Sequence, residues 1–226
     1  MKQASLLLLL LLFSPPFTVA QVNQIDGGFI KHWLILGPFS GNEIDQDYLE
    51  SVGGEASMDP KVGDTVKTTQ GETLTWSLYR SQGDIVDLLQ AVGDHNNVTA
   101  YAFCHLQGKQ DTDINILLGS DDGVAVWFNG KLVHKNSINR VLVIDQDGFS
   151  VQVKKRLNPM LVKITRCNSD WGFACRFPLL VSGRLLMLDR ETPHKNVVVQ
   201  ALKDGRVVST VLSDQTGEYE FSLPQT

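Results

Sequence analysis

The sequence has few of the features that mark an enzyme. It contains no Gly-x-Ser-x-Gly elbow, no His-Glu-x-x-His motif, no phosphate-binding loop and no Cys-x-x-Cys pair. Its five histidines show no spacing typical of a metal-binding pair, and no two acids stand out as a glycosidase pair. These absences predict a protein without catalytic activity.

The chain is also poor in membrane, nucleic-acid and helix signals. After residue 20, no segment approaches the run of about 20 apolar residues that a spanning helix needs. The formal net charge is −5 and the basic residues are dispersed, which argues against nucleic-acid binding. One segment, 84–92, has an apolar stripe at positions 85, 88, 89 and 92. It predicts a short connecting helix capped by Ser81 or Asp84.

One long apolar run does occur, at the N-terminus. Lys2 precedes apolar residues 6–13, and the small-residue pattern Thr18-Val19-Ala20 follows. This pattern predicts an export signal over residues 1–20. A retained anchor is the less favoured alternative, because the run is short and Pro15-Pro16 interrupts it. We therefore expect a secreted or extracytoplasmic protein, in the periplasm or at the cell surface.

The chain has only three cysteines, Cys104, Cys167 and Cys175. In an oxidising compartment they allow one bridge and leave one thiol unpaired. Cys167 and Cys175 flank a predicted turn at 168–170 and could face each other across adjoining strands. The alternative is three small buried side chains without a bridge, and the sequence leaves this choice open.

What the sequence does contain is alternation of apolar and polar residues, the pattern of short strands. In the first of these, Ala100, Ala102 and Cys104 fall on one face, and Tyr101 and Phe103 fall on the other. Residues 40–72 predict a surface excursion with one edge strand, and 157–159 a turn. The predicted strands are 98–106, 113–118, 124–129, 131–134, 149–154, 160–166 and 172–178.

A second set of strands follows a change of character at 181–183. These 44 residues are too few to bury an independent core comfortably. Either the chain is a fragment of a longer protein, or this unit leans on the first. The predicted strands are 184–188, 196–202, 206–212 and 219–223, with turns at 203–205 and 214–217.

Several stretches between residues 29 and 178 resemble the galactose-binding-like jelly roll and the PA14 family. The resemblance rests on residues 33–39, 117–134, 161–164 and 171–177 together with Asn158. It implies a jelly-roll β-sandwich over residues 21–181. Such modules often have a Gly-Trp-Asn turn where this chain has Arg156-Leu157-Asn158, a departure that weakens any borrowed binding site.

The C-terminal residues resemble a carboxypeptidase regulatory-like (transthyretin-like) module. Residues 182–184, 189–199 and 213–224 carry this resemblance, above all the Asp-x-x-Gly-x-Tyr-x-Phe stretch that starts at Asp214. It implies a small, incomplete Ig/transthyretin-like β-sandwich over residues 182–226, and further C-terminal domains of the same protein. The expected fold class is therefore all-β, a jelly roll followed by this smaller sandwich.

The candidate site residues are Asp121, Asp122, Asn129 and Trp171. Paired carboxylates in a loop can bind Ca²⁺, and in PA14 adhesins the matching pair holds a calcium ion that binds sugar hydroxyls, which the resemblance carries to Asp121 and Asp122. A tight turn is the favoured alternative. For Asn129 the alternative is the I′ turn of an Asn129-Gly130 hairpin.

Two further patterns need the same comparison. Trp171 lies beside a loop and could offer its ring to a sugar, although most strand tryptophans in sandwiches are core residues. Asp145 and Asp147 could place two carboxylates on one loop, or form an ordinary turn.

Together these patterns predict a non-catalytic binding module of a larger multidomain protein. Its loops at one end of the sandwich would recognise carbohydrate or another extracellular or cell-surface ligand. The alternative is a structural spacer that displays a missing C-terminal enzyme or sensor domain.

Overall fold

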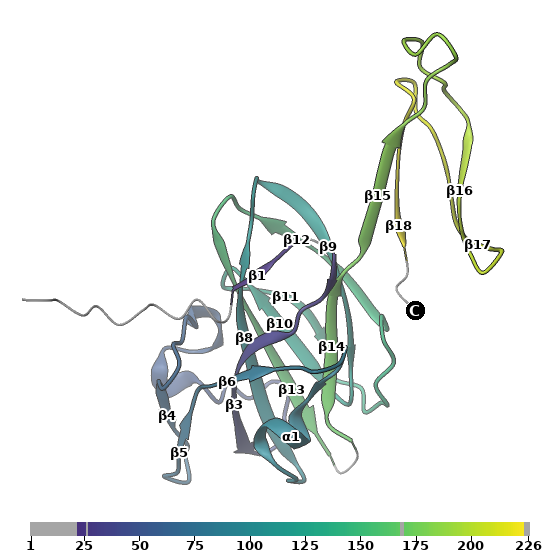
Figure 1. Cartoon of the computed structure of the whole chain (residues 1–226). Helices are drawn as coiled ribbons and strands as arrows, with labels where there is room; N and C mark the ends of the chain where they lie inside the picture. Colours follow the sequence, from purple (N-terminus) through teal and green to yellow (C-terminus); the bar gives the residue numbers. More distant parts are fainter. Residues whose placement is uncertain (1–21, 26, 168–169, 224–226) are drawn as a thin grey trace, which may run out of the picture.

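The computed structural model describes residues 22–25, 27–167 and 170–223 (Figure 1). The predicted export signal, residues 1–20, lies outside these residues. Within the described part, no helix is long and apolar enough to cross a membrane.

Two sheets form a sandwich, which confirms the predicted all-β class (Figure 1). The larger sheet has the order β11-β10-β13-β8-β3-β6, and β1 pairs with β8 in parallel. Its strands are β1 (Val22–Gln24), β3 (His32–Ser40), β6 (Ser77–Arg80), β8 (Val98–Gln107), β10 (Val124–Phe128), β11 (Lys131–Asn136) and β13 (Leu157–Arg166).

The smaller sheet has the order β12-β9-β14-β2, and β7 pairs with β14. Its strands are β2 (Gly28–Phe29), β7 (Val86–Asp87), β9 (Thr112–Ser120), β12 (Asp147–Val153) and β14 (Gly172–Phe177). Every strand pair in this sheet is antiparallel.

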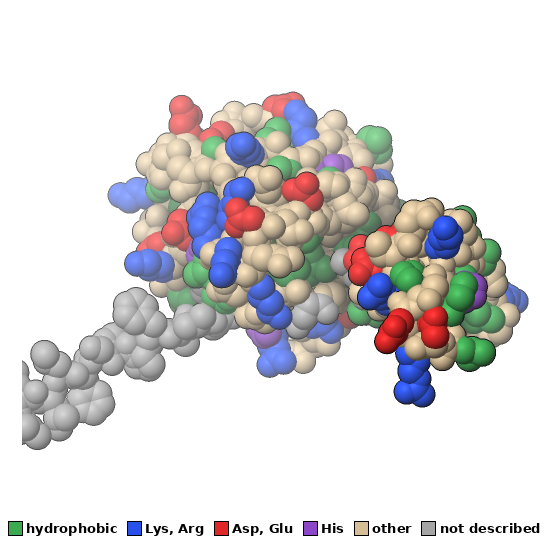
Figure 2. All heavy atoms as spheres, turned by 90° about the horizontal axis from the view of Figure 1, so that it is seen from above, with side chains coloured by type: hydrophobic (Ala, Val, Ile, Leu, Met, Phe, Trp, Pro, Cys, Tyr) green, Lys and Arg blue, Asp and Glu red, His purple; other side chains and the backbone are tan. Residues whose placement is uncertain are grey.

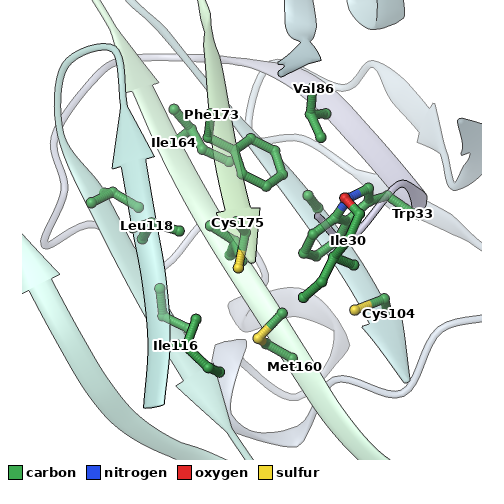
Figure 3. Packing of buried hydrophobic residues seen from close by; sticks show 14 of the residues in the cluster. Ile30, Trp33, Val86, Cys104, Ile116, Leu118, Met160, Ile164, Phe173 and Cys175 are labelled. Atoms are coloured by element: carbon green, nitrogen blue, oxygen red, sulfur yellow. The ribbon is translucent and has the colours of Figure 1, made fainter. Parts of the chain in front are cut away.

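The main core lies between the two sheets (Figure 3). Ala100, Ala102 and Cys104 of β8 point into it, as the alternation predicts. Trp33 of β3 meets Phe173 of β14 edge to face across the sandwich, with ring centroids 5.1 Å apart. This aromatic pair stabilises the packing of the two sheets, because the edge-to-face contact adds to the stabilisation from burying the two rings.

A second core covers the outer face of the larger sheet. Tyr101 and Phe103 of β8 point into it, opposite to their neighbours in the strand. The cover is the excursion after β3, which carries η1 (Glu50–Val52), η2 (Glu55–Ser57) and the hairpin β4 (Thr65–Lys67) and β5 (Thr73–Thr75). Its Leu49, Val66 and Trp76 are buried. The excursion is thus a packed layer, whereas the sequence predicted a surface segment. Within the predicted bounds, 40–72, it contains one strand, β4, as predicted.

A buried ion pair fastens this layer to the sheet. Lys163 of β13 has no exposed side-chain surface, and its Nζ lies 2.9 Å from Glu55 Oε1. The same ammonium donates to the carbonyl oxygens of Ile44 and Gln46, and the Tyr101 hydroxyl donates to Glu55 Oε1 over 2.6 Å. Burial raises the pKa of Glu55 and lowers the pKa of Lys163, and their mutual attraction opposes both shifts.

The predicted helix is shorter than expected. It is α1 (Leu88–Val92), and Asp87 caps it by accepting a hydrogen bond from Gln90 N over 3.0 Å. Neither Ser81 nor Asp84 is the cap, because Val86 and Asp87 pair with β14 as β7. The predicted turn at 157–159 is also wrong, since these residues lie in β13. The Asn158 side chain accepts from Lys154 N and donates to Lys154 O, four residues earlier in the chain.

The three cysteines are unpaired. Cys167 directly follows β13 of the larger sheet, whereas Cys175 lies in β14 of the smaller one and faces the main core. Because β13 and β14 belong to different sheets, the two cysteines do not face each other across adjoining strands. Residues 168 and 169 of the predicted turn lie outside the described residues. Cys104 is also in the core, and burial raises the pKa of both core thiols.

The C-terminal strands form two hairpin-like pairs, β15–β18 and β16–β17, that extend from one side of the sandwich (Figure 1). They are β15 (Leu179–Arg184), β16 (Val198–Lys203), β17 (Arg206–Leu212) and β18 (Glu218–Leu223). The predicted boundary at 181/182 falls inside β15. The first strand predicted here, 184–188, is instead an irregular segment with one bridge from Leu186 to Pro193.

Apolar side chains are exposed on this unit, among charged ones (Figure 2). Val198, Leu202 and Leu212 are each more than half exposed, at 57%, 62% and 60%. Phe221 is buried. As the short length predicts, the unit forms a thin layer rather than a large core of its own.

The buried ion pair leads to a stability prediction. We expect Lys163→Met to lower the free energy of unfolding by about 3–5 kcal/mol, because Glu55 would keep a buried charge without its partner. The double variant Lys163→Met/Glu55→Gln should be more stable than Lys163→Met alone, because that charge is gone. Urea unfolding of Lys163→Met, of Glu55→Gln and of the double variant measures the coupling free energy between the two residues. If the losses of the single variants simply add up in the double variant, the predicted coupling is contradicted.

A second prediction concerns the thiols. In the native protein, a thiol-reactive dye should label half-buried Cys167 first and leave Cys104 and Cys175 unmodified for far longer, because both are buried with raised pKa. All three should react once the chain is unfolded without a reductant. Fewer than three reactive thiols in the unfolded chain would show that a bridge exists.

A candidate ligand cleft at one end of the sandwich

Several loops meet at the end of the sandwich where β10 begins. The turn at 120–123 joins β9 to β10, and the segment 167–171 joins β13 to β14. Asp121 N donates to Gly172 O over 3.0 Å, and Asp122 N donates to Arg140 O over 2.9 Å. The backbone of the predicted Asp121-Asp122 pair therefore connects two other loops.

Asp122 has the contacts of the turn interpretation. Its backbone is left-handed, with φ of 57°, and its Oδ2 accepts a hydrogen bond from Cys167 N over 2.7 Å. The side chain is 4% exposed, and Ser120 Oγ donates to its carbonyl oxygen. The carboxylate thus holds the start of the 167–171 segment in place.

A calcium ion at this turn would need ligands beyond the two carboxylates. Ca²⁺ takes about 6–8 oxygen ligands. Among the described residues, no group of three or more His, Cys, Asp and Glu side chains is arranged to hold a metal ion. Asp121 is buried beside Asp122 and lines the cleft described below.

Arg140 fixes the loop between β11 and β12. Its guanidinium donates to both carboxylate oxygens of Asp147, and it also donates to Ser120 Oγ over 2.8 Å. His134 Nε2 lies 3.2 Å from Asp147, and its ring stacks on Phe149 with centroids 5.0 Å apart. Burial alone would raise the pKa of Asp147, but Arg140, together with His134 and Asn136, outweighs burial and lowers it.

The two carboxylates that the sequence placed on one loop, Asp145 and Asp147, have different partners. Asp145 accepts two hydrogen bonds from the Arg176 guanidinium, from Nε over 2.8 Å and from Nη2 over 2.5 Å. Asp147 binds Arg140 instead. Both arginines were missed by sequence reasoning, because no local pattern reveals which distant guanidinium a carboxylate will meet.

A cleft of about 720 Å³ lies between these loops. Asp121 and Trp171, two of the four predicted site residues, both line it. Among the described residues of the lining, the charged side chains are acidic, and several aliphatic side chains accompany them. The described lining residues are Tyr79, Ser81, Gln82, Gly83, Asp84, Ile85, Asp87, Leu89, Gln90, Asp121, Val141, Leu142, Ile144, Asp170, Trp171 and Gly172.

Trp171 does not offer the exposed face that a sugar platform needs. It is 2% exposed, and the Arg166 guanidinium lies 6.0 Å from its ring centroid. The expectation of an exposed ring is therefore wrong, because the Trp171 side chain packs into the main core between the two sheets. Its Nε1 is buried and has no hydrogen-bond acceptor among the described residues.

Asn129 lies away from the cleft. It sits at the far end of β10, whose five residues span about 17 Å. Asn129 and Gly130 have φ of 50° and 76°, so the predicted I′ hairpin is confirmed. The Asn129 amide donates to Asn158 Oδ1 over 2.9 Å, which ties the hairpin to β13.

A second cleft, of about 700 Å³, lies over the excursion on the outer face of the larger sheet. Polar side chains such as Asp47, Tyr48 and Thr69 line it. None of the predicted site residues is among them.

The comparisons with known proteins identify no family. No protein-family model matches the chain, and no curated protein matches it. Solved structures are similar only at a distance, and at such TM-scores these likenesses carry no argument about function.

Three of these structures illustrate the range. An anti-sigma factor domain-containing protein is 10% identical, with a TM-score of 0.40, over 64% of this chain and 41% of its own. A Ruminococcus gnavus β-glucuronidase is 11% identical, with a TM-score of 0.41, over 87% of this chain and 38% of its own. The PA14 domain of the MpAFP antifreeze protein is 11% identical, with a TM-score of 0.35, over 63% of this chain and 79% of its own.

The contacts of Asp122 lead to a prediction that separates a turn from a metal site. We expect Asp122→Ala to cost about 2–4 kcal/mol, because Cys167 N–H loses its acceptor and alanine resists a left-handed backbone. Asp122→Asn should cost less than about 1 kcal/mol, because asparagine keeps an oxygen and tolerates this backbone. Urea unfolding with and without a chelator is the measurement. A wild-type stability that drops with chelator, and no longer does so in Asp122→Asn, would support calcium instead.

Proposed function

We propose that this protein is a non-catalytic extracytoplasmic binding module that holds carbohydrate or another extracellular ligand in the 720 Å³ cleft. The cleft itself is the observation that carries the proposal. Its volume lies within the range of about 300–1,000 Å³ that is typical of small-molecule sites. Its walls come from separate loops that backbone hydrogen bonds hold together.

The lining supplies both kinds of contact that a sugar uses. Gln82, Gln90 and the carboxylates can bond hydroxyl groups, and Ile85 and Val141 can contact the apolar C–H face of a ring. Asp84 lies 3.2 Å from Lys31, and Asp87 caps α1, so these carboxylates have structural roles. This favours binding over acid–base chemistry.

The extracytoplasmic part of the proposal rests on the export signal predicted at residues 1–20. Attachment to further C-terminal domains rests on the resemblance of residues 182–226 to a longer module. A spacer that displays such a domain is the second candidate function. The exposed apolar residues on β16 and β17 favour it, because such residues are often covered by a neighbouring domain.

The proposal predicts that replacing an exposed aliphatic side chain in the cleft will weaken ligand binding. Ile85→Ser should reduce the affinity for the bound polysaccharide about 5–10-fold, because an aliphatic contact is worth about 1 kcal/mol. Leu157→Ser is a matched control: Leu157 is 40% exposed, close to the 44% of Ile85, and lies at the opposite end of the sandwich. Affinity gels containing plant, algal and bacterial polysaccharides provide the measurement.

Three results would count against the proposal. Flat responses across all the polysaccharides would remove carbohydrate as the ligand. Equal losses in the two variants would place binding outside the cleft. Loss of binding on adding chelator, together with insensitivity to Ile85→Ser, would move the site to the Asp122 turn.

A further inference from the structure

We infer that the cleft selects saccharides that carry an apolar substituent, such as an acyl or alkyl group, over unsubstituted saccharides. This inference rests on the proposed function and names the ligand class for the same site. It follows from the aliphatic side chains in the lining, from a loop that is fixed beside the cleft, and from two glutamine amides in the same lining.

The aliphatic side chains of the cleft come from two parts of the chain. Ile85 precedes β7 and Leu89 lies in α1, whereas Val141, Leu142 and Ile144 belong to the loop between β11 and β12. Three of these side chains are exposed, Ile85 at 44%, Val141 at 73% and Ile144 at 39%. Single exposed aliphatic residues are common on protein surfaces, whereas several that line one cleft indicate an interaction site.

Hydrogen bonds fix the loop that carries Val141. Asp122 N donates to Arg140 O over 2.9 Å, and Gln146 Nε2 donates to Val141 O over 2.9 Å. Ser120 N donates in turn to Gln146 Oε1 over 3.2 Å. The backbone is therefore held on both sides of the exposed valine, and this arrangement keeps the aliphatic side chains of the loop at the cleft.

A sugar ring alone would cover only part of this aliphatic surface. An unsubstituted ring offers its C–H faces as apolar surface, and hydroxyl groups surround them. A ring that contacts Ile85 would leave side chains of the loop in contact with water. An apolar substituent on the sugar would cover these side chains as well, and the additional area removed from water would strengthen binding.

The lining also contains polar groups that a purely aliphatic ligand could not bond. Among the described residues, nothing bonds the side-chain amide of Gln82, and Gln90 uses only its Oε1, which accepts from the Tyr79 hydroxyl over 2.9 Å. Sugar hydroxyl groups both donate and accept, so they suit both amides. A substituted saccharide therefore matches the two kinds of lining, whereas an aliphatic ligand or an unsubstituted sugar matches one.

The test uses the full chain and two pairs of probes. The first pair is hexyl and methyl β-D-glucopyranoside, which differ only in the length of the alkyl chain. The second pair is an O-acetylated xylo-oligosaccharide before and after alkaline removal of its acetyl groups. In calorimetric titrations we expect the hexyl glucoside to bind about tenfold or more tightly than the methyl glucoside, and the acetylated oligosaccharide about threefold or more tightly than the deacetylated one.

Val141→Ser tests whether the cleft is responsible. The variant should reduce the preference for the hexyl over the methyl glucoside about fivefold, because serine removes the aliphatic contact. Val143→Ser is the matched control in the same loop: Val143 is 59% exposed, and it is not among the described residues that line the cleft. Its preference should equal that of the wild type.

The source of the ligand follows from the pair that shows the preference. A preference for the hexyl glucoside alone would support the inference and indicate a glycolipid. A preference for the acetylated oligosaccharide alone would support it and indicate an O-acylated polysaccharide.

Other outcomes separate this inference from the proposed function. Equal binding within both pairs at the cleft would overturn the inference and keep the carbohydrate function. Equal losses of preference in Val141→Ser and Val143→Ser, or binding of a Val-rich peptide or of hexanol as tight as that of the hexyl glucoside, would also overturn the inference. If neither pair binds, the inference fails, and the proposed function stands only if an unsubstituted polysaccharide binds in the affinity gels and Ile85→Ser weakens that binding.

Discussion

The burial of both faces of the larger sheet is the constraint on which the rest of the structure depends. β8 and β13 lie at the middle of that sheet, and residues on both of their faces are buried. One face packs against the smaller sheet and the other against the excursion after β3. A central lysine, Lys163, therefore has no route to water, and its ammonium must be satisfied by Glu55 and by backbone carbonyls within the excursion. The excursion in turn depends on the lysine, because Lys163 supplies hydrogen bonds to Glu55 and to the carbonyl oxygens of Ile44 and Gln46.

Buried carboxylates with specific hydrogen-bond donors also determine the structure at the end of the sandwich. Asp122 accepts from Cys167 N, Asp147 from Arg140, and Asp145 from Arg176. Each of these carboxylates holds a loop against another part of the chain. The cleft is the space that remains once these loops are fixed, so structural carboxylates set the position of its walls.

Much of the fold could be predicted from the sequence, because period-two alternation and turn residues are local signals. The opposite faces of β8 and the Asn129-Gly130 hairpin follow from such signals. The excursion could not be predicted as a packed layer, because Leu49, Val66 and Trp76 are widely separated and show no common period. Of the site, the sequence predicted a role for loops at one end of the sandwich, and Asp121 and Trp171 both line a cleft there. The burial of Trp171, and the separation of Cys167 from Cys175, depend on which sheet each strand joins, which only the tertiary structure decides.

The turn chemistry also explains why paired aspartates have two interpretations from sequence alone. A carboxylate oxygen can donate an electron pair to a cation, or it can accept hydrogen bonds from backbone N–H groups in a turn. What distinguishes the two is whether the acceptor capacity is already used. At Asp122 it is directed at Cys167 N, and the residue is almost fully buried. Asp121, the other member of the pair, lines the cleft. The two aspartates of the motif therefore differ in position, one directed at a neighbouring backbone and the other beside the cleft.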